Sequence, residues 1–331
     1  MLDPKLLLEC SICPACGQRL RSFDRCEACG ARYGQEEGVP VLIPADAHRE
    51  VRVPFRQNRA APGEAFTRCF RYPPRRGASG SKTPHHLDLA HQDVLEHQPK
   101  GTKVLEIGCG GGQMRAWAED RGLVYVGTDI SRTRVREHLR RHGGPDLLCD
   151  AHFLPFADGS FDVVYSAAVT EHLASPFLVA QEVARVLRPG GVYLGNVSFL
   201  EPWHGGSFFH MSPMGVFELL SQAEFEIDCI WPGEGYSGYR ALCSMGNRVT
   251  RPLAFVGDGL FLVYRWSSRL RDRMRQGRPA DGDGIADLAR VAGATDWIAR
   301  KPAKAPAPAA DRSAEQAAIP AAHSPDLYPS G

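Results

Sequence analysis

The sequence lacks a long apolar run, a marked net charge and a secretory leader. Its longest apolar stretch, residues 253–264, is interrupted by Asp258 and is far shorter than the roughly 20 residues that cross a bilayer. The N-terminus has no basic start followed by an apolar core, so we expect no signal peptide and a cytoplasmic location. With 39 basic and 38 acidic residues the formal charge is +1, and the average charge favours no class of partner.

The ten cysteines show no disulfide framework, but four of them form two CxxC pairs near the N-terminus. A glycine follows each pair, Gly17 and Gly30, and glycine allows the sharp turn that aims backbone N–H groups at the sulfurs. This spacing predicts a tetrahedral zinc site in a ribbon over residues 1–45; two disulfides or an iron–sulfur cluster stay open as alternatives. The expected metal ligands are Cys13, Cys16, Cys26 and Cys29.

The charges are distributed unevenly along the chain. Residues 1–45 hold five basic and six acidic side chains, so the ribbon suits a folding or protein-docking role better than nucleic acid. The connector 46–83 reverses this balance: its residues 49–82 hold nine basic side chains against two acidic ones, with interleaved aromatic rings. That composition favours a solvated linker packed on the main domain, and a segment that holds RNA or an anionic substrate is the alternative.

Residues 84–250 alternate short strand patterns with helical stretches, which is typical of a mostly parallel sheet covered on both faces. We expect strands at "KVLEIG", "LVYVGTDIS", "DLLCDA", "FDVVYSAA", "GGVYLGNVSF", "FEIDCIWP" and "RALCSM". The segment 251–301 is expected to be a helical extension, and 302–331 is too poor in bulky apolar residues to fold and should be disordered.

The extension contains an amphipathic basic helix. Leu260, Val263, Leu270 and Met274 lie on one seam, and three arginines lie on another. The apolar seam could pack on the core, or it could make a weak contact with an anionic membrane surface or a lipid-linked substrate.

The chemically informative segment is "VLEIGCGGG" at 104–112, a strand that runs into a glycine loop and a helix. Gly108, Gly110 and Gly112 would let the backbone approach a ligand closely. The dinucleotide fingerprint needs glycine at 113, where Gln113 stands, so a nicotinamide cofactor is disfavoured. Asp129, at the end of the next strand, is placed to accept the hydroxyls of a ribose.

Together with "DAHFLPFADGSFDVV", "EHL" and "RVLRPGGVY", this pattern resembles the class I S-adenosylmethionine-dependent methyltransferases over residues 85–245. The resemblance implies an α/β fold with a seven-stranded Rossmann-like sheet whose last strand is antiparallel. It also implies S-adenosylmethionine as cofactor. The cofactor-binding residues implied are Glu106, Gly108, Cys109, Gly110, Gly112, Asp129, Ile130, Asp150, Ala151, Ser166 and Ala167.

The N-terminal segment "CPACG…CEACGARYGQEEGVPVLIP" is similar to small zinc-ribbon domains that accompany methyltransferases acting on tRNA, rRNA or release factors. Gly34 departs from that family, which usually has proline there. The fused architecture also resembles large-subunit rRNA guanine methyltransferases, whose second metal hook commonly includes histidine.

Candidate general bases gather in "LEPWHGGSFFHMSP", 200–213, after the fifth expected strand, and similar loops occur in small-molecule methyltransferases of this class. We expect His204 and His210 to act on the acceptor, while His172 fits a structural role better. The sequence therefore predicts a methyltransferase for a small-molecule or sugar-containing acceptor. An RNA methyltransferase and a non-catalytic scaffold that keeps the cofactor only to fold are the alternatives.

Overall fold

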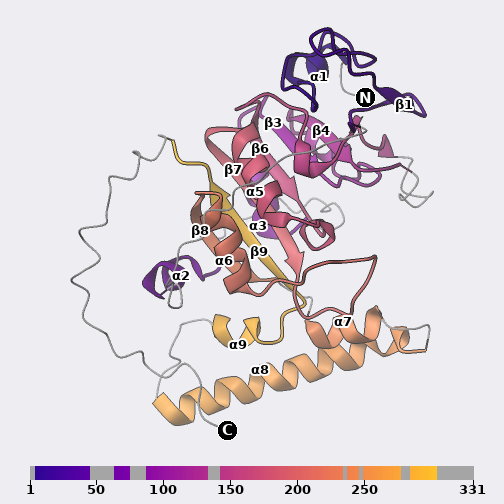
Figure 1. Ribbon diagram of the computed structural model, residues 1–331. Helices are drawn as coiled ribbons and strands as arrows, with labels where there is room; N and C mark the ends of the chain where they lie inside the picture. Colours follow the sequence, from indigo (N-terminus) through magenta and orange to yellow (C-terminus); the bar gives the residue numbers. More distant parts are fainter. Residues whose placement is uncertain are drawn as a thin grey trace.

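The computed structural model describes residues 4–44, 63–74, 87–132, 142–233, 237–245, 249–276 and 284–303 (Figure 1). Its strands are β1 Gly34–Glu36, β2 Val39–Val41, β3 Lys103–Ile107, β4 Val124–Asp129, β5 Leu147–Leu148, β6 Phe161–Ser166, β7 Leu187–Ser198, β8 Glu226–Pro232 and β9 Ala294–Arg300. Its α-helices are α1 Pro4–Cys10, α2 Gly63–Cys69, α3 Leu89–Glu96, α4 Arg115–Glu119, α5 Pro176–Val186, α6 Pro213–Gln222, α7 Gly238–Ser244, α8 Ala254–Gln276 and α9 Ile285–Ala289. Most of the connector 46–83 and the tail from 304 lie outside these residues.

One mixed sheet runs through the molecule in the order β1-β2-β5-β4-β3-β6-β7-β9-β8. The strands from β5 to β7 are parallel, and β9 is antiparallel to both β7 and β8. The expected α/β sheet with an antiparallel last strand is therefore confirmed. The expected count of seven is wrong, because the described sheet has nine strands.

The two additional strands come from the N-terminal segment. The hairpin β1–β2 joins the sheet edge through a parallel pairing of Val41 with Leu148. Ser11 also bridges to Phe156, and the backbone N–H of Ile12 donates to the carbonyl of Pro155 at 2.9 Å. The N-terminal segment thus extends the main sheet, as Figure 1 shows at the top of the molecule.

The last strand is built by a different segment from the one expected. "RALCSM" lies in and just after α7, because the Ser237 hydroxyl caps that helix by accepting from the backbone N–H of Arg240 at 3.2 Å. The antiparallel strand is β9, within the stretch 251–301 that was expected to be wholly helical. Trp297 and Ala299 of β9 are fully buried, and pairing with strands on both sides stabilises them there.

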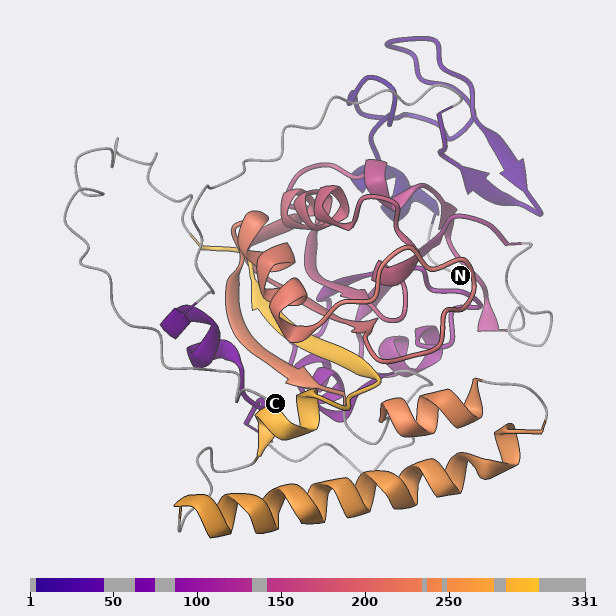
Figure 2. The ribbon, with the colours of Figure 1, turned by 60° about the horizontal axis from the view of Figure 1, so that its bottom comes forward.

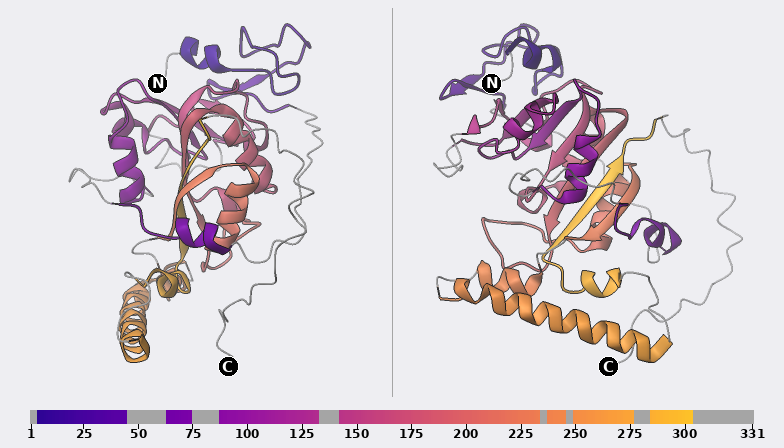
Figure 3. Two further views of the ribbon diagram at one scale, coloured as in Figure 1. Left: turned by 90° about the vertical axis from the view of Figure 1, so that its left-hand side faces the viewer. Right: turned by 180° about the vertical axis from the view of Figure 1, so that it is seen from behind.

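Two apolar clusters cover the two faces of the sheet, because successive strand side chains point to opposite faces. On one face, strand residues such as Leu105 and Val164 pack with helices α5 and α6 and with Leu42 of the N-terminal segment. On the other face, Val104 and Tyr165 belong to the cluster that includes residues of α3 and α4. Figure 3 shows these helix layers from two sides.

A helical insertion separates β8 from β9. It contains α7, the long helix α8 and the short helix α9, and it lies along the end of the molecule opposite the N-terminal segment (Figures 1 and 2). Among the described helices, α8 included, none combines the length and apolarity that a membrane crossing requires. The insertion begins beside the loop that follows β7, since Gly238 of α7 lies against Leu200.

Candidate functional site

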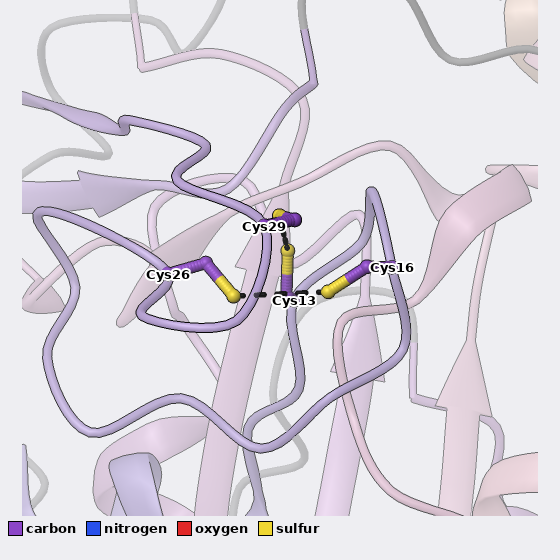
Figure 4. Close-up of side chains that lie close together, drawn as sticks. All are labelled: Cys13, Cys16, Cys26 and Cys29. Atoms are coloured by element: carbon purple, nitrogen blue, oxygen red, sulfur yellow. Dashed lines mark hydrogen bonds between the residues drawn. The ribbon is translucent and has the colours of Figure 1, made fainter.

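The four N-terminal cysteines lie together between two tight turns (Figure 4). The Sγ atoms of Cys13 and Cys29 are 3.7 Å apart, and those of Cys16 and Cys26 are also 3.7 Å apart. A tetrahedral ion with Zn–S bonds of about 2.3 Å requires sulfur separations of roughly 3.8 Å. Gly17 and Gly30 take positive φ angles of 74° and 75°, as the turns after the hooks require. The cluster therefore has the donor set and spacing of a tetrahedral metal site.

A pocket opens where the glycine loop leaves β3; we call it the glycine-loop pocket. Its lining residues are Leu87, Glu106, Gly108, Cys109, Gly110, Gln113, Met114, Tyr165, Ala167 and Ala168. Five expected cofactor residues belong to this lining: Glu106, Gly108, Cys109, Gly110 and Ala167. Gln113, Met114 and Tyr165 were not expected; each lies within a few residues of an expected motif, but no rule of spacing selects them.

Glycine is required in the loop for two different reasons. Gly108 has a φ of +68°, and a Cβ there would lie 2.3 Å from Cγ2 of Val169. Gly110 has a φ of +55°, but a Cβ there would meet only Oε1 of Gln113, at 3.8 Å. The backbone at 110 consequently faces open space, which is the cradle that a closely bound ligand needs.

Asp129 ends β4 and holds the glycine loop in place. Its Oδ2 accepts from the backbone N–H of Gly110 at 2.9 Å, and its Oδ1 accepts from that of Ile130 at 2.7 Å. Asp150 follows β5 and caps a short 3₁₀ helix, Ala151–Phe153. Its hydrogen bond with the His152 side chain lowers the pKa of Asp150. Both carboxylates stand at carboxyl ends of parallel strands, where open α/β sheets bind ligands.

Six of the expected cofactor residues do not line the glycine-loop pocket: Gly112, Asp129, Ile130, Asp150, Ala151 and Ser166. Ser166 is 2% exposed, and its hydroxyl lies 3.1 Å from that of Tyr193 inside the core. A Cβ at Gly112 would lie 2.9 Å from the carbonyl oxygen of Gly144, so this glycine serves loop packing. The side chain of Ser166 therefore does not face the pocket.

Glu106 is the acidic group of the pocket lining. Burial raises the pKa of Glu106 to about 7, and the hydrogen bond from the Tyr125 hydroxyl opposes that shift. The side chain is nevertheless only half-buried and borders an open pocket, so solvent screens part of the effect.

The pocket wall leads directly into a second cluster. β6 ends at Ser166, Ala167 and Ala168 line the pocket, and the 3₁₀ helix Thr170–His172 follows. The carbonyl of Glu171 accepts from the backbone N–H groups of Phe208 and Phe209, at 2.6 and 3.2 Å. These bonds hold the loop 199–212, here named the acceptor loop, beside the pocket.

Three imidazoles and two carboxyl groups meet at the acceptor loop. The rings of His172 and His204 have centroids 5.4 Å apart, and those of His204 and His210 are 5.8 Å apart. His204 Nδ1 lies 3.0 Å from the carbonyl of Pro202, so it donates there and leaves Nε2 as the basic nitrogen. His210 Nε2 lies 3.1 Å from the Ser207 hydroxyl oxygen. The structure thus brings together the two expected catalytic histidines.

A single hydroxyl bridges the two carboxyl groups. Ser198 Oγ lies 2.7 Å from Glu171 Oε1 and 2.9 Å from Glu201 Oε2, although one hydroxyl has only one proton to donate. Burial raises the pKa of both Glu171 and Glu201, against the opposing effect of the Ser198 hydrogen bond. A proton on either carboxyl would complete the second hydrogen bond, so the cluster can hold one proton next to His204.

The same cluster offers a second set of metal donors. Glu171, His172 and His204 each present a ligand atom within 4.8 Å of the others. Glu171 Oε2 is buried and has no hydrogen-bond partner among the described residues. One carboxylate and two imidazoles are donors that divalent transition metals accept. The sequence analysis did not select Glu171 or Ser198 as site residues. The one feature that pointed to Glu171 is that this carboxylate follows an expected strand within a few residues.

Comparisons with known proteins agree with this geometry. Residues 105–195 match the family described as a methyltransferase domain. The 2-methyl-6-phytyl-1,4-hydroquinone methyltransferase of Synechocystis sp. is 39% identical over 110 residues, covering 31% of this chain and 34% of that protein. The 24-methylenesterol C-methyltransferase 2 of Oryza sativa subsp. japonica is 42% identical over 111 residues, covering 31% and 30%.

One similar solved structure is phosphoethanolamine N-methyltransferase 2 of Haemonchus contortus in complex with S-adenosyl-L-methionine. Its TM-score is 0.42 and its sequence identity is 21%, and the alignment covers 65% of this chain and 52% of that chain. The chain spans about a third of the length of the two curated relatives named above. Residues 105–195, which run from β3 into β7, thus match a methyltransferase domain, and all of the glycine-loop pocket lining except Leu87 lies in this stretch.

Proposed function

We propose that this protein is an S-adenosylmethionine-dependent methyltransferase that acts on a small-molecule acceptor. The observation that carries the proposal is the adjacency of the glycine-loop pocket to a proton-holding cluster of histidines and carboxyl groups. The matched domain supports the reaction type, and the two relatives, a hydroquinone and a sterol methyltransferase, support a small-molecule acceptor.

The residues present fit the cofactor. Gly110 offers backbone at the open cradle, and the Asp129 carboxylate, at the end of the next strand, has the chemistry to accept ribose hydroxyls. We place the adenine near Asp150 and Ala151. When bound, S-adenosylmethionine supplies a methyl group already activated on a sulfonium, so the chain has only to hold the acceptor in line and manage a proton.

The acceptor loop performs the second task. If the acceptor is a hydroxyl, Nε2 of His204 or an imidazole nitrogen of His210 takes its proton. The buried carboxyl groups of Glu171 and Glu201 favour the imidazolium that results, because opposite charges attract strongly where water is excluded. Trp203 and Phe208 are 76% and 62% exposed and offer apolar surface to the acceptor.

Binding of S-adenosylmethionine and of its demethylated product tests the cofactor assignment by calorimetry. Asp129→Ala would also release the glycine loop, so Gly108→Ala is the cleaner variant. Its new Cβ meets Val169 and its φ is unfavourable, and we expect the Kd to rise on the order of tenfold or more. The double variant Gly108→Ala/Val169→Ala should recover part of that loss. A wild-type chain that binds neither ligand would refute the enzymatic function.

We also propose that the four-cysteine cluster holds one zinc ion per chain, because its sulfur spacing suits Zn²⁺. So small a segment depends on metal for much of its stability. Chelation should make residues 4–44 selectively sensitive to protease, and metal analysis should return zinc. Iron in place of zinc, or unchanged protease resistance after chelation, would contradict this assignment. A protein partner at this segment is compatible with its acidic composition.

A further inference from the structure

The long helix α8 turns its apolar side outward. Eight of its large apolar side chains are between 42% and 78% exposed: Phe255, Val256, Leu260, Leu262, Val263, Trp266, Leu270 and Met274. At 100° per residue they fall in one band of about 160°. The seam that could have packed on the core, Leu260, Val263, Leu270 and Met274, is therefore exposed. We call these eight residues the outer face of α8.

The opposite side of α8 is firmly attached to the molecule. Gly257 packs against α7 so closely that a Cβ there would lie 2.6 Å from the carbonyl oxygen of Tyr239. Asp258 forms an ion pair with Arg240, and the Tyr264 hydroxyl donates to the carbonyl of Asp287 at 3.1 Å. These contacts fix the rotation of α8, so the outer face is held outward by the fold.

The charge around the outer face identifies its partner. Residues 249–276 contain six arginines against two aspartates. Arg269 is exposed and by helical position borders the apolar band on one side. Arg271 borders it on the other side and forms an ion pair with Asp287 at 2.8 Å. An apolar band that contains a tryptophan and is bordered by arginines suits the boundary between acyl chains and anionic headgroups. A second copy of the chain would instead bring like charges together.

We infer that the outer face of α8 docks this protein on an anionic membrane surface, with the helix lying in the plane of the interface. Leu242 of α7 and Val249 and Leu253, which precede α8 in the chain, are also 66%, 78% and 45% exposed. The acceptor loop begins beside α7, against Gly238. Resting on the proposed function, this placement assigns the acceptor to the lipid-soluble or amphiphilic compounds that partition into the membrane.

Vesicle cosedimentation of the intact chain tests the inference without cofactor or acceptor, so its failure is distinct from failure of the proposed function. We expect binding to vesicles of phosphatidylcholine with phosphatidylglycerol, weaker binding to phosphatidylcholine alone, and weakening by salt. Val263→Glu/Trp266→Glu should lower the partition coefficient about tenfold or more. The matched control is Leu89→Glu/Met214→Glu, which adds the same charge at exposed apolar positions on α3 and α6 and should bind as the wild type does.

Three results would overturn the inference. The first is that the wild type does not bind anionic vesicles. The second is that the test and control variants lose vesicle binding equally. The third is that the wild type does not bind vesicles but forms a dimer in sedimentation equilibrium, and that Val263→Glu/Trp266→Glu dissociates this dimer. The last result would assign the outer face to a contact between copies of the chain. Thermal unfolding of each variant establishes that the fold is retained.

Discussion

The glycine-loop pocket and the acceptor loop are neighbours, but they are built in different ways. The pocket is shaped by backbone: glycines with positive φ, a loop tied to Asp129, and two alanines behind a strand end. The acceptor loop is shaped by side chains, with a buried serine between two carboxyl groups and histidine rings in contact. A site shaped by backbone suits a ligand that stays the same while the sequence changes. A site shaped by side chains can be adapted to a new acceptor by substitution.

The largest expected effect comes from substitutions in the acceptor loop. His204→Ala or His210→Ala should reduce turnover by about 10²- to 10⁴-fold, because a positioned base for the acceptor proton is lost. The Kd for S-adenosylmethionine should stay unchanged, since neither histidine lines the glycine-loop pocket. Single-turnover rates and calorimetry on each variant measure the two effects separately.

A histidine elsewhere provides the control for that experiment. His97, on the C-terminal end of α3, is half exposed and hydrogen-bonds only within its own helix among the contacts described, so His97→Ala should leave turnover intact. Both loop variants should keep the wild-type melting temperature. Full activity in the double variant His204→Ala/His210→Ala would remove these histidines from the mechanism, and a melting temperature that falls in step with activity would assign them a structural role.

The glycine loop and the strands β3 and β4 beside it could be predicted from the sequence, because their signals are local. The pattern consists of a strand, a glycine loop and an acidic residue at the end of the next strand, all within about 25 residues. Each part is recognisable because the residue type determines the local backbone conformation. The position of Asp129 at the end of β4 followed from that pattern. The sequence could not tell which way Ser166 points, because that depends on the pleat of β6 and on Tyr193 across the core.

Long-range pairing explains the errors. β9 finds its partners β7 and β8 across the helical insertion, and a charged Asp296 interrupts its apolar pattern. The hairpin β1–β2 joins the sheet through a single pairing with β5, more than 100 residues away in the chain. Glu171 was missed for the same reason, since it lies in a 3₁₀ helix and its partner Ser198 ends β7, 27 residues later. Short segments acquire their structure from neighbours that local patterns do not reveal.

A smaller effect is expected from Glu106 in the lining of the glycine-loop pocket, on the pH dependence of stability. The pKa of Glu106 is about 7 in the folded chain against an ordinary value of 4.5, so the protonated form is favoured by folding. Its contribution to stability is fully present below about pH 4.5 and is lost as the pH rises through 7. After allowance for the open pocket, we expect the wild type to lose about 1 to 2 kcal/mol of unfolding free energy relative to Glu106→Gln between pH 5 and 8.

Chemical denaturation of both chains at several pH values measures this difference, and comparison with Glu106→Gln cancels the titration of the other groups. Parallel stability profiles for the wild type and Glu106→Gln would show that the carboxyl group is solvated in the folded chain.

The smallest expected effect concerns the contact between the N-terminal segment and the cofactor side. Arg132, three residues after Asp129, reaches the hairpin tip with Nε 3.4 Å from Oε2 of Glu37 and Nη1 3.3 Å from the Glu37 carbonyl. Glu37→Gln removes the charge and keeps the carbonyl. Because Glu37 is 56% exposed, we expect a loss of less than about 1 kcal/mol in stability and a change of less than about fivefold in the Kd for S-adenosylmethionine.

Glu27→Gln is the control, since Glu27 pairs with Arg21 inside the N-terminal segment at 3.5 Å and is similarly exposed. Raised salt should shrink the effect of both variants, because exposed ion pairs are screened. If Glu37→Gln alone weakened cofactor binding tenfold or more, the hairpin would belong to the cofactor side, and that side would no longer depend on local motifs alone. A small effect would leave the N-terminal segment as an extension of the sheet that stabilises β5 without shaping the pocket.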